Sequence, residues 1–97
     1  MKKMNCLIIG FGRMGERYLK ALKKLGFNTI DIMDKSKDKL KIAKKKYNFN
    51  IKNTHNNFDS CIRFKRPNLA IVSTTADFHK KYVIQLAEKK VKNALEL

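Results

Sequence analysis

Residues 6–15, Cys-Leu-Ile-Ile-Gly-Phe-Gly-Arg-Met-Gly, decide the fold of this chain. An apolar run ends in the pattern Gly-x-Gly-x-x-Gly and passes directly into a segment with helical periodicity. In this pattern the first glycine permits a tight turn, the second lets a ligand approach the backbone, and the third lets the helix pack closely on the strand. Because a helix N-terminus favours negative charge, the stretch predicts a site for the pyrophosphate of a dinucleotide. The candidate contact residues in this loop are Gly10, Phe11, Gly12, Arg13, Met14 and Gly15.

The composition is that of one globular domain covering residues 1–97. Apolar residues make up 43% of the chain and charged residues 32%, and no apolar run approaches the ~20 residues that span a bilayer. We therefore expect a cytoplasmic protein without a membrane segment. The net charge of +15 raises the possibility of a nucleic-acid binder,. The lysines occur in every helical segment, however, which favours solvated helix faces and argues against nucleic acid as a partner.

The cysteines and histidines do not form a metal-binding pattern. Cys6 and Cys61 are too few for a disulfide framework and lack ligand spacing,. We expect both to be small core residues. His55 lies in an Asn-rich stretch, where we expect a solvated or capping histidine in a turn.

Strand and helix signals alternate along the whole chain. This alternation predicts an α/β fold with a doubly wound parallel sheet of about five strands, incomplete at the C-terminus. The expected strands are residues 4–10, 28–33, a short one within 48–52, 69–73, and one from about 91 to 97. The expected helices are residues 13–25, 36–47, one within 53–65, and 77–89. The residues expected to face the core from these helices are Met14, Tyr18, Leu22, Leu25, Leu40, Ala43, Tyr47, Phe58, Cys61, Ile62, Val83, Leu86 and Ala87.

An acid follows the second expected strand at Asp34, 19 residues after Gly15. A carboxylate at that edge of the sheet can accept hydrogen bonds from the adenosine ribose hydroxyls. The alternative is that Asp34 only caps the next helix together with Ser36. Asp31 is a rival acid, but it lies in the middle of the strand. Lys35 could tolerate a ribose phosphate, whereas Asp34 would repel one, so the pattern favours NAD over NADP.

The second informative stretch is Ile-Val-Ser-Thr-Thr-Ala-Asp-Phe-His, residues 71–79. A buried strand ends there in small hydroxyl residues at the same edge of the sheet as the glycine turn. A histidine follows one turn into the next helix. The candidate contacts to the phosphates and the nicotinamide ribose are Ser73, Thr74, Thr75 and His79.

These two motifs, in this order, resemble the glucose–fructose oxidoreductase/inositol dehydrogenase family, usually written Gfo/Idh/MocA. Its members carry the glycine pattern near the start, often an acid after strand two, and a strand that runs into Ala-Thr-Pro-x-x-x-His. Here Thr74 and His79 keep that spacing, while Thr75 stands where proline is usual. The resemblance covers essentially the whole chain.

The resemblance implies a nicotinamide-dependent oxidoreductase that acts on the hydroxyl or carbonyl group of a sugar, cyclitol or related compound. The family's next landmark is Glu-Lys-Pro, whose lysine serves the substrate. Here the chain either ends before that landmark or has Leu97 in place of the lysine. The family's second domain, which carries the substrate site, is not in this sequence. We therefore expect a truncated cofactor-binding domain with no catalytic residues of its own, inactive alone, whose last strand is an exposed edge open to self-association.

Two other functions stay open from the sequence. A regulatory domain that senses NAD or a nucleotide, as on channels and transporters, would use the same glycine pattern and acid. The spacing of Thr74 and His79 argues against it. A basic nucleic-acid-binding protein is supported only by the net charge, and steeply salt-dependent DNA binding would distinguish it.

Overall fold

The computed structural model describes residues 5–27, 29–64, 67–74, 76–88 and 94–96. Strands and helices alternate strictly along these ranges. The elements are β1 (Cys6–Ile9), α1 (Arg13–Lys24), β2 (Ile30–Met33), α2 (Lys37–Lys46), β3 (Ile51–His55), α3 (Phe58–Phe64), β4 (Leu69–Val72), α4 (Ala76–Glu88) and β5 (Ala94–Glu96).

The described strands form one parallel sheet with the order β3-β2-β1-β4-β5. This confirms the predicted doubly wound α/β fold. The chain runs from β1 outward to β3 and then crosses back to β4 on the other side of β1. The last residue of β1, Ile9, lies beside Met33 of β2 and Val72 of β4, so three strands end at the same level. In such a sheet the reversal of strand order opens a crevice for ligands at the carboxyl ends of the strands.

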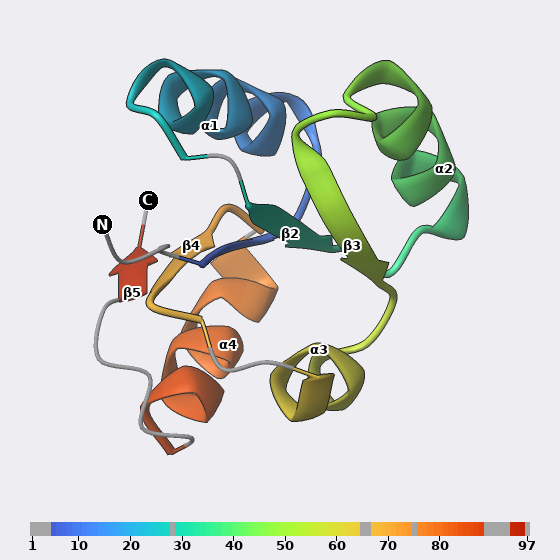
Figure 1. Ribbon diagram of the computed structural model, residues 1–97. Helices are drawn as coiled ribbons and strands as arrows, with labels where there is room; N and C mark the ends of the chain where they lie inside the picture. The colour runs from blue at the N-terminus through green and yellow to red at the C-terminus, as the bar shows by residue number, and fades with distance from the viewer. Residues whose placement is uncertain (1–4, 28, 65–66, 75, 89–93, 97) are drawn as a thin grey trace.

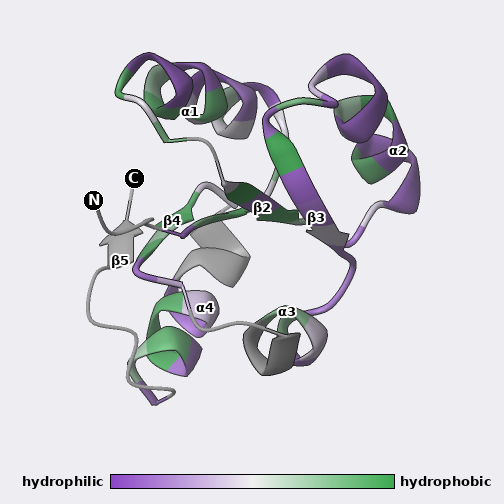
Figure 2. Ribbon diagram, viewed as in Figure 1, coloured by the Kyte–Doolittle hydropathy of each residue, from purple (hydrophilic) through white to green (hydrophobic). Residues whose placement is uncertain are grey.

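Helices cover both faces of the sheet (Figure 1), with α1 and α2 on one side and α3 and α4 on the other. The strand side chains alternate between these layers because successive residues point to opposite faces. Cys6 and Ile8 of β1 pack in the α1–α2 layer, whereas Leu7 and Ile9 pack in the α3–α4 layer. The central strands are therefore apolar on both faces, while the outer helix surfaces are mostly hydrophilic (Figure 2).

The rotation of α1 differs from the predicted one. Gly15, Leu19 and Leu22 are buried, whereas Met14 is 45% exposed and Leu25 is 75% exposed. Gly15 sets this rotation because it lies directly against the Gly10 carbonyl group, and the residues one and two turns later share its face. The expectation that Met14 and Leu25 face the core is wrong, and Tyr18 is partly buried as expected.

The third strand begins later than predicted. Residues 47–50 form a turn in which the Asn50 and Ile51 amides donate to the Tyr47 carbonyl, so the strand occupies Ile51–His55. Its burial alternates, because β3 is the outermost strand on this side of the sheet. An alternating strand lacks the continuous apolar run by which β1 and β4 are recognised in the sequence. His55 is consequently the last residue of β3 and not part of a turn.

The remaining elements follow the prediction closely. In α2, Leu40 and Ala43 are buried and Tyr47 is partly buried; in α3, Phe58 and Cys61 are buried. In α4 the buried residues are Tyr82 and Leu86, with Val83 partly buried. Ala87 is exposed, contrary to expectation, because Tyr82 stacks on Phe58 and turns that face of the helix inward. The last strand is confirmed over Ala94–Glu96, and the rest of its predicted range and the side chain of Ile62 lie outside the described residues.

Candidate functional site

Two of the loop glycines are required by the fold itself. Gly10 has φ of +91°, and a Cβ there would lie 2.9 Å from the Thr74 methyl carbon and 3.0 Å from the Ser73 carbonyl oxygen. A Cβ at Gly15 would overlap the Gly10 carbonyl oxygen. These glycines therefore let the loop after β1 pass between α1 and the end of β4.

Gly12 has a different role, since a Cβ at this position would meet no protein atom within 4 Å. Its φ of −88° is also available to any residue,. Gly12 precedes the first turn of α1, whose amide groups have no partners within the helix,. It also lines two neighbouring hollows of about 300 and 280 Å³. The fold does not need a glycine here, but a ligand that lies against the backbone does.

Asp34 is held in place by backbone amides from two loops. Its Oδ2 accepts from the Phe11 amide at 2.8 Å, and its Oδ1 accepts from the Ser36 amide at 2.8 Å. The Asp34 amide in turn donates to the His55 carbonyl at 3.0 Å. The carboxylate thus joins the glycine loop to the start of α2. The cap of α2 is Ser36, whose hydroxyl accepts from the Lys39 amide at 3.2 Å.

The end of β4 braces the glycine loop from the other side. The Ser73 amide donates to the Ile9 carbonyl at 2.9 Å. The Ser73 hydroxyl lies 2.6 Å from the Gly10 carbonyl oxygen and 3.3 Å from that of Ile9. Both donors of Ser73 are therefore used within the protein, which leaves its hydroxyl to act only as an acceptor toward a ligand.

The larger of the two hollows brings together six of the twelve predicted residues. Gly10, Gly12, Asp34, Lys35, Ser73 and Thr74 all line it. It also contains Lys39 and Tyr82, which the sequence did not indicate. Lys39 could have been found as the residue one helical turn after Lys35. Tyr82 carries no such signal, because its place depends on how α4 packs.

Tyr82 brings an aromatic ring to this hollow from the opposite face of the sheet. It is 4% exposed and stacks on Phe58, with ring centroids 5.9 Å apart. Burial raises the pKa of its hydroxyl, and the negative charge of Asp34 raises it further. Tyr82 is therefore neutral at physiological pH.

The other predicted loop residues lie around the glycines. The Phe11 ring is buried against Tyr47 in an edge-on contact at 6.3 Å, so only its backbone faces the site. Arg13 lines the smaller hollow with Gly12 and Lys39, and Met14 is exposed beside it. Thr75 and the side chain of His79 lie outside the described residues.

Two features are absent from the part of the chain that the structure describes. No helix among the described residues combines the length and the apolar character needed to cross a membrane. Their His, Cys, Asp and Glu side chains form no group of three or more that could hold a metal ion.

Comparison with known proteins identifies the family. A sequence model described as the oxidoreductase family with NAD-binding Rossmann fold, GFO_IDH_MocA, matches residues 4–96. The chain belongs to this family. The resemblance in the glycine loop and at the end of β4 is thereby confirmed, and NAD is the family's cofactor. No curated protein sequence matches the chain.

Solved structures of an oxidoreductase and of two inositol dehydrogenases share the fold at low identity. An oxidoreductase from Agrobacterium radiobacter, in complex with NAD+, L-tartaric acid and magnesium, is 21% identical with a TM-score of 0.83. A myo-inositol 2-dehydrogenase from Lactobacillus plantarum is 22% identical with a TM-score of 0.80. A scyllo-inositol dehydrogenase from Lactobacillus casei, with bound NAD(H) and scyllo-inositol, is 16% identical with a TM-score of 0.78. Each match covers 96% of this chain but only 27% of the other protein.

The residues of this chain fit such a dinucleotide. The space above Gly12, which a side chain would fill, adjoins the first turn of α1. Asp34 lines the same hollow as Gly12, and a carboxylate at this edge of the sheet can accept hydrogen bonds from the ribose hydroxyls.

Proposed function

We propose that these 97 residues are the cofactor-binding domain of an NAD-dependent oxidoreductase and that they hold the dinucleotide in the hollow between Gly12 and Asp34. The observation that carries this proposal is the contrast among the three glycines. Gly10 and Gly15 are packed against protein atoms, whereas Gly12 faces open space. Because no protein atom requires a glycine at position 12, the missing side chain of Gly12 supports close approach by a ligand.

In this proposal the pyrophosphate lies over Gly12 and accepts hydrogen bonds from the first-turn amides of α1. The exposed Arg13 side chain adds positive charge beside it. Asp34 accepts hydrogen bonds from the adenosine ribose hydroxyls. Each of its oxygens already accepts one amide proton, and a carboxylate oxygen has room for a second.

The preference for NAD over NADP follows from the charge of Asp34. A ribose 2′-phosphate would lie beside this carboxylate, and two anions at such a distance repel. Lys35 and Lys39 line the same hollow and reduce the repulsion. We therefore propose a preference for NAD(H) that is moderate in size.

The Ser73 hydroxyl holds the Gly10 carbonyl and thereby fixes the turn, and Thr74 lies beside it at the mouth of the hollow. We place Thr75 and His79 with them, toward the nicotinamide end, from the family motif. When bound, the nicotinamide supplies the hydride acceptor or donor for the reaction.

For the whole protein we propose oxidation or reduction of a hydroxyl or carbonyl group on a sugar or cyclitol. Support comes from the family and from matched structures that include two inositol dehydrogenases. The chain spans about a quarter of the length of those structures, at 27%. We place the groups that bind and protonate the substrate outside these 97 residues.

Calorimetric titration of the chain with NADH and with NADPH tests the cofactor site. Asp34→Asn should weaken NADH binding about tenfold or more, because a hydrogen bond to a charged acceptor contributes about 1.5–3 kcal/mol. The affinity for NADPH should fall less, so the preference for NADH over NADPH should become smaller. Asp38→Asn is the matched control, since Asp38 is an exposed acid in the first turn of α2. If Asp34→Asn and Asp38→Asn bind NADH equally well, Asp34 does not contact the ribose.

A further inference from the structure

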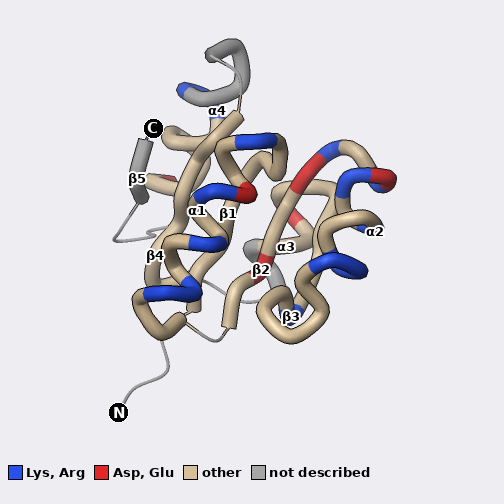
Figure 3. The backbone as a smooth tube through the Cα atoms, turned by 90° about the horizontal axis from the view of Figure 1, so that it is seen from above, with Lys and Arg blue, Asp and Glu red and all other residues tan. Residues whose placement is uncertain are grey.

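Lysine residues are concentrated in and around α2. Residues 35–52 contain eight lysines and one acid. The tube in Figure 3 shows basic residues recurring along α2, as they also do along α1. Several of the α2 lysines line a large hollow, which lies between α2 and β3 and has a volume of about 750 Å³.

We call this hollow the α2–β3 groove and define it by Lys37, Leu40, Lys41, Lys44, Thr54 and Asn56. None of its lining residues among those described is acidic. Thr54 and Asn56 supply neutral polar groups from the β3 side. The α2 wall of the groove thus carries lysine ammonium groups beside the apolar Leu40, the β3 wall carries neutral polar groups, and the lysines favour an anionic ligand,.

We propose that the α2–β3 groove binds single-stranded nucleic acid. Lys37, Lys41 and Lys45 form one row along α2, four residues apart, and Lys45 also lines the groove. An α-helix rises 1.5 Å per residue, so successive lysines are about 6 Å apart along the axis. This is close to the separation of consecutive phosphates in a single strand, and the row matches about three of them.

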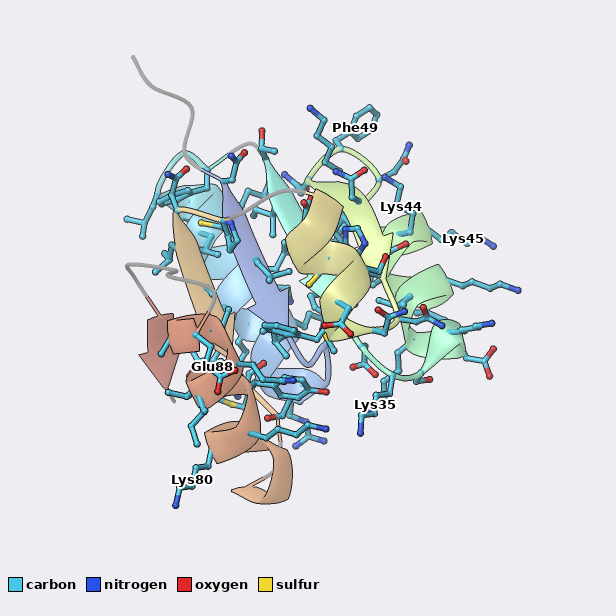
Figure 4. All side chains as sticks on the ribbon, turned by 90° about the horizontal axis from the view of Figure 1, so that it is seen from below. Lys35, Lys44, Lys45, Phe49, Lys80 and Glu88 are labelled. Atoms are coloured by element: carbon cyan, nitrogen blue, oxygen red, sulfur yellow. The ribbon has the colours of Figure 1, made fainter. Side chains whose placement is uncertain are left out.

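The exposed aromatic ring of Phe49, the residue that follows the groove-lining Asn48, supports a ligand that carries bases. Phe49 lies in the turn between α2 and β3 and is 93% exposed. In Figure 4 it lies on the same side of the molecule as Lys44 and Lys45, well away from Lys80. Basic grooves with exposed aromatic rings bind single strands because the phosphates meet the cations and the bases stack on the rings.

The walls of the groove are held in place before any ligand arrives. Lys44 crosses from α2 to β3, where its Nζ donates to the Ile51 carbonyl at 2.5 Å and to the Lys52 carbonyl at 3.2 Å. Ile30 pairs with Ile51 and Asp31 with Asn53, so Lys52 is an extra residue in β3. Lys44 thus donates hydrogen bonds to the carbonyl groups at this bulge and holds the helix against the strand.

The same bulge argues against an acidic peptide that would add to the sheet as a further strand. A bulge and a lysine on an edge strand both interrupt strand pairing. An acidic peptide would also make no use of Phe49. We therefore assign the groove to a nucleic acid and make an acidic polymer one outcome of the test.

The test is fluorescence anisotropy of a labelled 12-mer of deoxythymidine, titrated with the 97-residue chain between 50 and 200 mM NaCl. With about three phosphates neutralised, the logarithm of the binding constant should fall with the logarithm of salt concentration with a slope of about −2. Lys41→Gln/Lys45→Gln should make the slope shallower by about 1.4. The charge-matched control Lys20→Gln/Lys24→Gln changes two exposed lysines of α1 and should leave affinity within about twofold of the unmodified chain,.

Phe49→Ala should lower the affinity at least about fivefold. Leu25→Ala is its control, because Leu25 is also a largely exposed apolar residue outside the groove. Gly12→Val should leave oligonucleotide binding unchanged, which separates this site from the dinucleotide site. Circular dichroism confirms the fold of each variant.

Four results with the variants and competitors would overturn the proposal. They are equal weakening by the α1 control, no effect of Phe49→Ala, loss of binding in Gly12→Val, and competition by polyglutamate as strong as competition by unlabelled oligonucleotide. No detectable binding at 50 mM NaCl would overturn it as well.

Discussion

Replacing Gly12 by valine should abolish most cofactor binding without unfolding the domain. The Cβ of residue 12 would meet no protein atom within 4 Å, and the backbone there has an ordinary φ of −88°. A substitution of this kind usually changes stability by no more than about 0.5 kcal/mol. The added methyl groups would instead occupy the hollow of about 300 Å³ in which we place the pyrophosphate.

The size of the effect on binding can be estimated from the cost of overfilling a packed site. Extra methyl groups in a well-packed environment cost about 1–3 kcal/mol. At 1.4 kcal/mol per factor of ten, this corresponds to about a 5- to 150-fold weaker Kd for NADH. The loss should be similar for NADPH, since both cofactors share the pyrophosphate.

Gly15→Ala is the matched comparison, because it should lower the stability of the fold, whereas Gly12→Val should lower the affinity for the cofactor. A Cβ at residue 15 would overlap the Gly10 carbonyl oxygen. The first effect is therefore on folding, with a cost of about 1–3 kcal/mol from overpacking, reduced by the better helix propensity of alanine.

The assay combines urea denaturation with calorimetric titration of NADH for the three proteins. Our reasoning predicts normal stability with weak binding for Gly12→Val, and reduced stability for Gly15→Ala. It is refuted if Gly12→Val binds NADH as tightly as the unmodified chain. It is also refuted if Gly12→Val lowers the urea midpoint as much as Gly15→Ala does.

Three further predictions concern stability and its dependence on pH and ligand. Ser73→Ala removes the hydroxyl that binds the Gly10 carbonyl and should lower the free energy of unfolding by about 0.5–1.5 kcal/mol, as measured by urea denaturation; an unchanged midpoint would contradict this role. Burial raises the pKa of Cys6 to about 11 and that of Cys61 to about 12. Both thiols therefore keep their protons in the folded state at pH values at which the unfolded chain loses them, so stability should fall as the pH is raised from 9 to 11, and a Cys6→Ala/Cys61→Ala protein should show a smaller fall. NADH at 100 times its Kd should stabilise the chain by about 2.7 kcal/mol, measured as a rise in the urea midpoint. At the same NADH concentration Gly12→Val should show a smaller rise, of about 0.3–1.8 kcal/mol for a Kd that is about 5- to 150-fold weaker.

Much of this fold could be predicted because its central strands carry a strong signal. β1 and β4 are buried on both faces and appear in the sequence as continuous apolar runs. The glycine pattern fixed the turn after β1. β3 was misplaced because an outer strand has one solvated face and a bulge at Lys52, so its residues alternate imperfectly.

The orientation of helices was harder to predict than their position. In α1 both Met14 and Leu19 are apolar, and the periodicity does not decide which of them faces the sheet. Contact between Gly15 and the Gly10 carbonyl decides it, and that contact joins two elements in space. Tyr82 was missed for a related reason, because its burial depends on stacking with Phe58 across α3 and α4.

In the candidate site, too, the positions of residues could be predicted from the sequence, but contacts between separate elements could not. Sequence spacing indicated Asp34 as the acid after β2, and in the structure it lines the same hollow as Gly12. The spacing did not indicate that the carboxylate also joins the Phe11 and Ser36 amides. Asp34 therefore has a structural role that would persist without a ligand, and a loss of stability in an Asp34 variant says nothing about ribose binding.

Gly12 gives the more selective evidence for function, for the opposite reason. Within the described structure its missing side chain serves no packing contact, so a change there reports on the ligand alone. A Gly-x-Gly-x-x-Gly pattern thus contains two kinds of information. Its outer glycines specify the turn and the helix packing, and would be needed in a domain of this fold that had lost its ligand. The middle glycine is the position at which such a domain could accept a side chain, which makes it the residue that distinguishes a retained cofactor site from a retained fold.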